Sequence, residues 1–129
     1  VVLGNDLCVY PSYYEPWGYT PLESVAFSVP CITTDLAGFG LWANKVRGTL
    51  STIMDGVEVV HRTDYNYSEV VAGVEDTVVR YASLPASAVR SCRTRAHRLA
   101  QQALWSRFIA YYREAYDIAL HRAEARCGQ

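Results

Sequence analysis

The sequence predicts an α/β protein in which a parallel sheet is flanked by helices and followed by two C-terminal helices. Short apolar runs that end at proline, glycine or aspartate alternate with longer amphipathic segments. The order strand, helix, strand, loop, strand, helix contains no short hairpin connection, which favours parallel pairing. Three strands make a thin sheet, so we expect part of a larger Rossmann-like domain whose first strands lie outside this chain.

Three segments have the composition of buried strands. They are expected at residues 7–12, 29–35 and 56–62, where apolar and β-branched side chains cluster. Pro11 closes the first of them, because proline has no N–H to donate to a sheet.

The first helix is expected at residues 20–30. Pro21 suits the first helical position, and Thr20 with Glu23 fits the T-x-x-E capping box. Residues 36–40 form a glycine loop. The pattern at residues 40–48 is ambiguous and allows a turn of helix.

The second half of the chain is expected to be helical. Residues 67–83 place valines and Tyr81 near helical spacing, and Pro85 ends that helix. Residues 86–125 then favour two helices that meet near Trp105.

Composition narrows the classes of function. The chain has 129 residues, half of them hydrophobic, which is enough for one domain with a core. Its net charge of −1 and pI near 6.3 give no case for nucleic acid or an anionic membrane as partner. No apolar run reaches the roughly 18 residues that a membrane span needs. The chain opens without methionine or a signal peptide, and we expect it to be a piece of a longer protein.

The cysteines at positions 8, 31, 92 and 127 form no C-x-x-C pair. Cys8 and Cys31 lie in apolar runs, where a free thiol behaves as a small hydrophobe. We therefore expect buried, reduced thiols and a cytoplasmic setting.

Neither metal-ligand spacing nor a phosphate-binding glycine loop of the Walker type occurs, so no metal and no cofactor is expected. The histidines at 61, 97 and 121 are expected at the surface or at edges.

The stretch "YYEPWGYTPLE", residues 13–23, carries two glutamates with seven residues between them. It leaves the first expected strand and enters the first helix, and ligands of parallel sheets bind beyond the carboxyl ends of strands. A helix N-terminus with free N–H groups holds phosphate, and Gly18 allows close approach of a ligand. Pro16 biases Glu15 towards an extended conformation. From the residues alone, a structural interpretation is as good as a ligand-binding one. In it Glu15 is a solvated loop charge, Glu23 closes the capping box, and the aromatic side chains only pack.

A longer stretch, "PSYYEPWGYTPLESVAFSVPCITTDLAGFG", resembles the glycogen synthases of the animal and fungal type. The segments "RTRAHRLAQQALW" and "YYREAYDIAL" are similar to that family's closing helices. The resemblance covers nearly the whole chain but only the C-terminal part of the family's length. It implies a retaining glycosyltransferase with two Rossmann-like domains, of which residues 1–129 would belong to the C-terminal, nucleotide-sugar-binding domain.

The resemblance also implies a role for each residue of the loop. Glu15 would be catalytic, beside the transferred glucose, either as a nucleophile or by stabilising positive charge. The donor-binding residues would be Trp17 and Gly18 at the sugar, Tyr19 and Thr20 at the diphosphate, and Glu23 at the ribose. Glucose would pass with retention from a nucleotide-diphosphate glucose to the non-reducing end of an α-1,4-glucan acceptor. UDP-glucose is favoured over ADP-glucose as donor.

Two parts of such an enzyme are expected outside this chain. They are the N-terminal, acceptor-side domain and the basic residues that neutralise the leaving diphosphate. We therefore expect this chain alone to be inactive, and its exposed apolar helix surface to favour self-association.

A basic face is expected on the helix that contains "AVRSCRTRAHRL". Arg90, Arg93 and His97 share one side, with Arg98 beside them. In the resembling family, arginines of the matching helix bind glucose 6-phosphate, so these arginines form a candidate phosphate effector site. A solvated basic face is the alternative, and nucleic acid binding is not favoured because the patch is isolated.

Two other functions stay in view. A sucrose- or trehalose-pathway transferase shares the spacing of the glutamates, although it usually shows other residues between them. A degenerate transferase domain, used for binding or assembly, is the non-enzymatic alternative. Intact Glu15, Gly18, Thr20 and Glu23 argue against degeneration.

Overall fold

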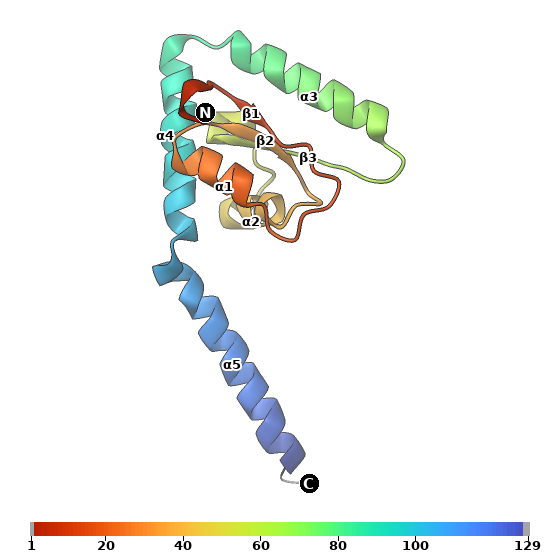
Figure 1. Ribbon diagram of the computed structural model, residues 1–129, viewed down its shortest axis with the longest axis vertical. Coiled ribbons are helices and arrows are strands. Elements are labelled where there is room, and N and C mark those ends of the chain that lie inside the picture. The colour runs from red at the N-terminus through yellow and green to blue at the C-terminus, as the bar shows by residue number, and fades with distance from the viewer. Residues whose placement is uncertain (1, 128–129) are drawn as a thin grey trace.

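The computed structural model describes residues 2–127 and contains a three-stranded parallel sheet with the order β1-β2-β3 (Figure 1). The strands are β1 (Cys8–Val9), β2 (Cys31–Thr34) and β3 (Val57–Val60). Cys31 pairs with Cys8 on one side and with Val57 on the other, which sets the register. The predicted α/β class with a parallel, helix-flanked sheet is confirmed.

The first strand is shorter than predicted, because the chain turns at Pro11. The N–H of Tyr10 donates to the carbonyl of Ile32 at 2.8 Å, but the N–H of Ser12, which would donate next in a parallel ladder, turns back to the carbonyl of Tyr10 at 2.8 Å. The chain therefore leaves the sheet at this point and begins the loop that carries Glu15.

Residues 2–127 also form five α-helices and three single turns of 3₁₀ helix. The α-helices are α1 (Tyr19–Ala26), α2 (Gly38–Arg47), α3 (Tyr67–Ala82), α4 (Ala86–Ala100) and α5 (Trp105–Cys127). The 3₁₀ turns are η1 (Val2–Gly4), η2 (Ile53–Asp55) and η3 (Gln101–Ala103). The ambiguous segment belongs to α2, which begins at Gly38, so the predicted glycine loop of residues 36–40 is wrong for its last three residues. The two helices predicted to meet near Trp105 are α4 and α5.

The predicted capping box at the start of α1 is wrong. The helix begins at Tyr19, and its N-cap is Gly18, which has no side chain and adopts a left-handed conformation with φ 110°. Thr20 is therefore the second helical residue and Glu23 the fifth. Pro21, the third residue, is tolerated because the first four N–H groups of a helix have no partner within it. The glycine turn, rather than a polar side chain, starts this helix.

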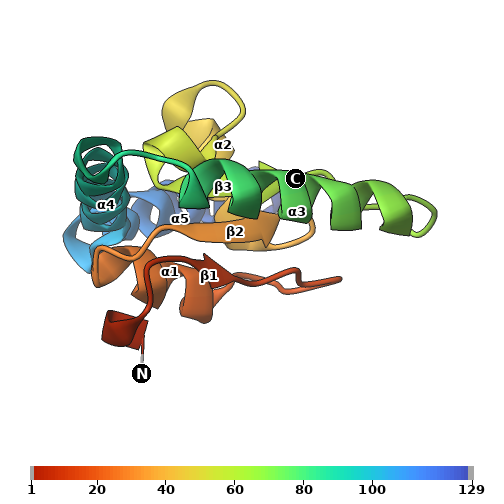
Figure 2. The ribbon, with the colours of Figure 1, turned by 90° about the horizontal axis from the view of Figure 1, so that it is seen from above.

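The core lies between the sheet and helices α1, α2 and α4. Val25, Cys31, Phe39, Val57 and other side chains of these elements are fully buried there. Helix α4 lies at the amino ends of the strands (Figure 2). There Ala96 packs against the backbone of Gly56, the residue before β3. That close approach leaves no room for a Cβ at Gly56.

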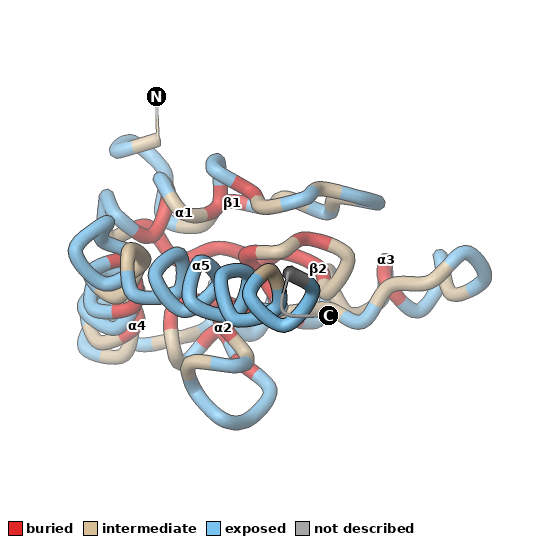
Figure 3. Tube along the Cα trace, turned by 90° about the horizontal axis from the view of Figure 1, so that it is seen from below, coloured by how far each residue is buried: buried red, intermediate tan, exposed pale blue. Residues whose placement is uncertain are grey.

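Helix α5 differs from the rest of the chain. It projects away from the sheet (Figure 1) and is exposed along most of its length (Figure 3). Its exposed aromatic side chains include Trp105, Tyr112 and Tyr116. Within residues 2–127, no helix has the length and apolar character needed to cross a membrane.

The expected burial of the thiols is confirmed for Cys8, Cys31 and Cys92, which are buried and free. Burial raises the pKa of the Cys31 thiol and of the Cys92 thiol, so both stay protonated. The side chain of Cys127 lies outside the described part of the structure.

Candidate active site

The loop of residues 12–18 lies at the carboxyl end of the sheet, held by backbone hydrogen bonds. The N–H of Glu15 donates to the carbonyl of Leu36 at 3.2 Å, and the N–H of Gly38 donates to the carbonyl of Glu15 at 3.1 Å. Glu15 thereby forms an isolated parallel bridge with Ala37. The connection between β2 and α2 therefore braces the backbone on which the candidate catalytic side chain sits.

A glycine makes this brace possible. A Cβ at Gly38 would collide with the carbonyl oxygen of Pro16. The N–H of Phe39 also donates to the carbonyl of Trp17 at 2.5 Å, so α2 starts directly against the loop. The glycines of "LAGFG" thus serve close packing of two backbones.

The Glu15 carboxylate is half-buried and bonded within its own loop. The hydroxyl of Ser12 donates to Glu15 Oε2 at 3.1 Å. The hydroxyl of Thr34, at the end of β2, donates to the carbonyl of Ser12 at 2.6 Å. Sequence reasoning assigned no role to Ser12, Thr34 or Gly38, although all three lie in the stretch of residues 11–40 that carries the family resemblance.

The predicted donor residues divide into buried and exposed groups. The Trp17 ring packs against Phe39, Trp42 and Phe108, with ring centroids 5.4–6.4 Å apart. Gly18 is buried and has a positive φ, which would be strained for any residue with a side chain.

The other donor residues lie on α1. Tyr19 and Thr20 are exposed at its N-terminus, where the free N–H groups lie, and Glu23 is exposed one turn further on. The helix start thus carries both a polar surface and a partial positive charge.

A second polar group occupies the same end of the sheet and was not predicted. His61 Nδ1 lies 2.5 Å from Asp35 Oδ2, while Asp35 Oδ1 accepts the N–H of Arg62 at 2.9 Å. The hydrogen bond and the negative charge of Asp35 raise the pKa of His61. The Arg62 guanidinium donates to the carbonyl of Pro11 and lies 5.2 Å from the Tyr13 ring centroid. The segment after β3 therefore supports the loop from its other side.

The arginines of α4 lie at the opposite, amino end of the sheet. Arg93 and Arg98 line one shallow depression together with His97. Arg90 lines a different depression beside Asp6, which also pairs with Arg93 at 3.5 Å. The three predicted effector arginines thus share a helix but not one pocket.

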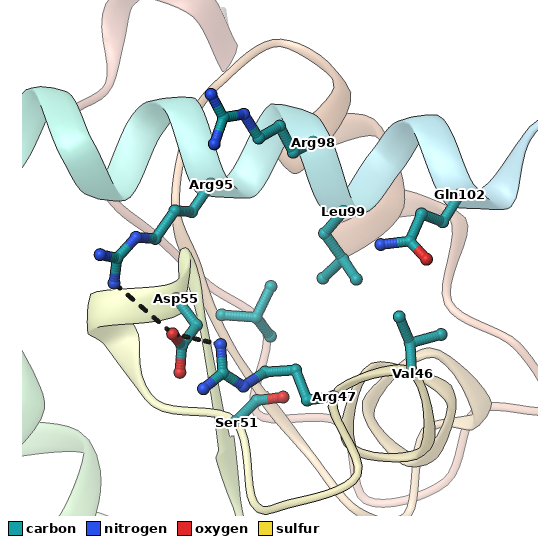
Figure 4. A pocket seen from close by; sticks show the side chains of 9 residues that line it. Val46, Arg47, Ser51, Asp55, Arg95, Arg98, Leu99 and Gln102 are labelled. Carbon is teal, nitrogen blue, oxygen red and sulfur yellow. Dashed lines mark ion pairs between the residues drawn. The ribbon is translucent and has the colours of Figure 1, made fainter.

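Arg98 additionally lines a cavity of about 190 Å³ between α4, α2 and η2 (Figure 4). Arg47 and Arg95 both pair there with the carboxylate of Asp55, the second at 3.7 Å. The Ser51 hydroxyl on this cavity is buried and has no hydrogen-bond partner among residues 2–127. Sequence reasoning missed Arg47 and Ser51, which only the fold brings beside α4.

Metal binding has no visible basis in the described chain. Across residues 2–127, no three histidine, cysteine, aspartate or glutamate side chains are grouped as ligands of a metal ion would be. The expectation of no metal stays a prediction.

The fold and the loop define a class: an α/β unit with a parallel sheet whose polar loop and helix N-terminus meet at the carboxyl ends of the strands. The chain belongs to the glycogen synthase family, since the family model "Glycogen synthase" matches residues 1–126. It is 34% identical over 122 residues to glycogen [starch] synthase isoform 1 of Saccharomyces cerevisiae and, over the same length, to glycogen [starch] synthase of Neurospora crassa. Identity to the liver glycogen [starch] synthase of Mus musculus is 30% over 122 residues.

These alignments cover 95% of this chain but only 17% of each relative. The chain therefore spans about a sixth of the length of the curated relatives that it matches, and residues outside it complete those proteins.

Proposed function

We propose that this chain forms the donor-binding part of a retaining glycosyltransferase of the glycogen synthase type. The reaction moves glucose from a nucleotide-diphosphate glucose to the non-reducing end of an α-1,4-glucan. The observation that carries the proposal is the braced Glu15 loop beside the free N-terminus of α1. This arrangement supplies a carboxylate on a braced backbone and a phosphate-binding helix end at one place.

The residues of the loop divide the work of binding. The N–H groups of Tyr19 and Thr20 face the donor diphosphate, and the Glu23 carboxylate accepts hydrogen bonds from ribose hydroxyls. The backbone at Trp17 and Gly18 lines the glucose pocket, with the Trp17 ring holding that backbone against α2. Glu15 acts on the glucose itself.

Glu15 favours transfer with retention in one of two ways. As a nucleophile it would form a covalent glucosyl intermediate, and as an electrostatic group it would stabilise positive charge at the anomeric carbon. Both require a carboxylate held close to the donor, and the backbone bonds of Glu15 hold the peptide groups that carry it.

The partners of the site come from outside the chain. UDP-glucose is the proposed donor, in preference to ADP-glucose, and the acceptor is an α-glucan. A further, N-terminal domain of the same protein supplies the opposite wall of the cleft and the cations that neutralise the diphosphate. The proposed location is the cytoplasm, and no cofactor is needed.

A degenerate domain that only binds or assembles is the second candidate. The test measures glucose incorporation into glucan by the full-length protein, with UDP-glucose and ADP-glucose in separate assays. Sensitivity of the product to β-amylase reports new α-1,4 linkages and hence retention.

The decisive variant is Glu15→Ala, compared with Glu75→Ala on the exposed face of α3 as matched control. We expect Glu15→Ala to abolish incorporation while the melting temperature stays within a few degrees, and the control to leave incorporation unchanged. Near-normal turnover by Glu15→Ala would remove Glu15 from the mechanism. No incorporation by the wild-type protein with either donor would support the binding module.

The isolated 129-residue chain should fold without catalysing. Calorimetric titration with UDP-glucose should detect weak binding or none, because only one wall of the cleft is present. The exposed rings of Trp105, Tyr112 and Tyr116 should make it self-associate at high concentration, as sedimentation can measure. Glucan synthesis by this chain alone would contradict the split-cleft proposal.

A further inference from the structure

Ser12 lies in the loop after β1 and is held in place by the neighbouring strand β2. Its carbonyl accepts the Thr34 hydroxyl at 2.6 Å, and Thr34 is 1% exposed, so the interaction is shielded from water. Its N–H donates to the carbonyl of Tyr10 at 2.8 Å across Pro11. Ser12 therefore has a backbone fixed on both sides, directly after β1.

From this position the side chain of Ser12 reaches the Glu15 carboxylate. Ser12 Oγ lies 3.1 Å from Glu15 Oε2, and the Cα of Gly18 faces the same oxygen, since a Cβ there would lie 3.5 Å from it. Among the residues that the structure describes, Ser12 is the one whose side chain donates to this carboxylate. The second oxygen, Oε1, is left for other partners.

The backbone brace by itself does not place the carboxylate. The bonds to Leu36 and Gly38 fix the peptide groups of Glu15, but three side-chain torsions remain between Cα and the carboxylate. A free glutamate side chain populates several rotamers, and restricting it to one costs conformational entropy. A hydrogen bond to an ionised group is stronger than a neutral one, so the Ser12 hydroxyl selects one of these rotamers.

We propose that Ser12 is a positioning residue for transfer, whose hydroxyl holds one oxygen of the Glu15 carboxylate while Thr34 anchors Ser12 to the sheet. The inference rests on the proposed function, because it gives Ser12 a role only through Glu15. Ser12 does not touch the donor diphosphate in this scheme. Its loss should therefore act on turnover rather than on donor binding.

The test uses the full-length protein with Ser12→Ala and Ser12→Thr, and measures kcat and the KM for UDP-glucose separately. Ser12→Ala should lower kcat about tenfold to hundredfold, the range for losing a hydrogen bond to a charged group. The KM should change less than about twofold, since uniform binding is untouched. Ser12→Thr, which keeps the hydroxyl, should restore kcat to within a few-fold of wild type.

The matched control is Ser83→Ala. Ser83 also donates its hydroxyl, to the carbonyl of Val79 at 2.8 Å, but at the end of α3. It should leave kcat and KM unchanged. If Ser12→Ala does not fold, Ser12→Cys keeps the side-chain volume with a weaker donor and should still lower kcat.

The outcomes separate this inference from the proposed function. Loss of activity in Glu15→Ala with unchanged kcat in Ser12→Ala overturns the positioning role alone. A loss in Ser12→Ala that appears mainly in KM, or that Ser12→Thr does not restore, also overturns it. Unchanged kcat in both Glu15→Ala and Ser12→Ala overturns the proposed function itself.

Discussion

The two ends of the sheet hold their functional candidates by different means. At the carboxyl end, backbone hydrogen bonds to Leu36 and Gly38 fix Glu15. At the amino end, helix α4 packs tightly through Ala96 on Gly56, while its arginines meet acidic side chains, Arg93 with Asp6 at 3.5 Å and Arg95 with Asp55 at 3.7 Å. Backbone hydrogen bonds position Glu15, whereas side-chain ion pairs position the arginines.

This difference predicts how each end tolerates substitution. Exposed ion pairs such as Arg93 with Asp6, whose aspartate side chain is 89% exposed, contribute roughly 0–1 kcal/mol to stability. Backbone contacts across a glycine offer no such tolerance, because neither partner can move without shifting its element.

The largest effect should follow Gly56→Ala at the amino end. Its Cβ would lie 2.5 Å from the Ala96 nitrogen, and Gly56 has φ 92°, which is strained for any other residue. We expect a loss of about 3 kcal/mol in the free energy of unfolding, measured by urea denaturation. Gly73→Ala in α3 is the control, since a Cβ there lies at an ordinary 3.6 Å from Val60. It should be neutral or stabilise by about 0.5–1 kcal/mol.

The next largest effect is expected for Gly38→Ala at the carboxyl end, which should lower the turnover of the full-length protein. The new methyl group would push the Pro16 carbonyl and shift the peptide of Glu15. A displacement near 1 Å costs roughly a hundredfold in turnover, which glucan assays on the full-length protein would measure. Equal kcat in Gly38→Ala and wild type would show that the brace does not matter for the reaction.

Glu23→Gln should weaken donor binding by about tenfold, because an amide is a poorer acceptor for two ribose hydroxyls than a carboxylate. The KM for UDP-glucose should rise while kcat and the melting temperature hardly change. Gly18 rather than Thr20 caps α1, so Glu23 takes part in no capping box. Its replacement should therefore not change the stability of the helix. An unchanged KM would remove Glu23 from the donor site, and Glu75→Gln serves as control.

A smaller effect is expected from the arginines of α4. Glucose 6-phosphate should activate the full-length protein a few-fold at most, and the triple replacement of Arg90, Arg93 and Arg98 by alanine should erase that activation. Arg113→Ala on exposed α5 should not. Activation that persists in the triple variant would move any effector site elsewhere, with Arg47 and Arg95 as the next residues to replace.

The smallest effect concerns His61 and Asp35. Asp35 raises the pKa of His61 above its ordinary value of 6.5, so the protonated form favours the folded state. The stabilising contribution is complete below pH 6.5 and is lost as pH rises through the raised value. His61→Gln should therefore flatten the fall of melting temperature with pH, whereas His121→Gln on α5 should not. Identical pH profiles for wild type and His61→Gln would contradict this coupling.

The sequence by itself determined the class of fold and the place of the candidate site. Alternating apolar runs and amphipathic segments sufficed to predict the parallel order, and the stretch around Glu15 pointed to the end of a strand. These features are local: hydrophobic period, proline and glycine act within a few residues of themselves. For the same reason, the sequence also predicted the end of the first strand at Pro11 and the meeting of α4 with α5 near Trp105.

Only the tertiary structure decided what holds the site. The start of α1 at Gly18 depends on a buried turn, so the local capping signal of Thr20 and Glu23 was misleading. The link from Thr34 to Ser12 spans 22 residues. The approach of Arg47 to α4 likewise depends on where α2 packs. Such contacts form between segments that sequence spacing does not relate, because packing, not local propensity, brings them within hydrogen-bonding distance.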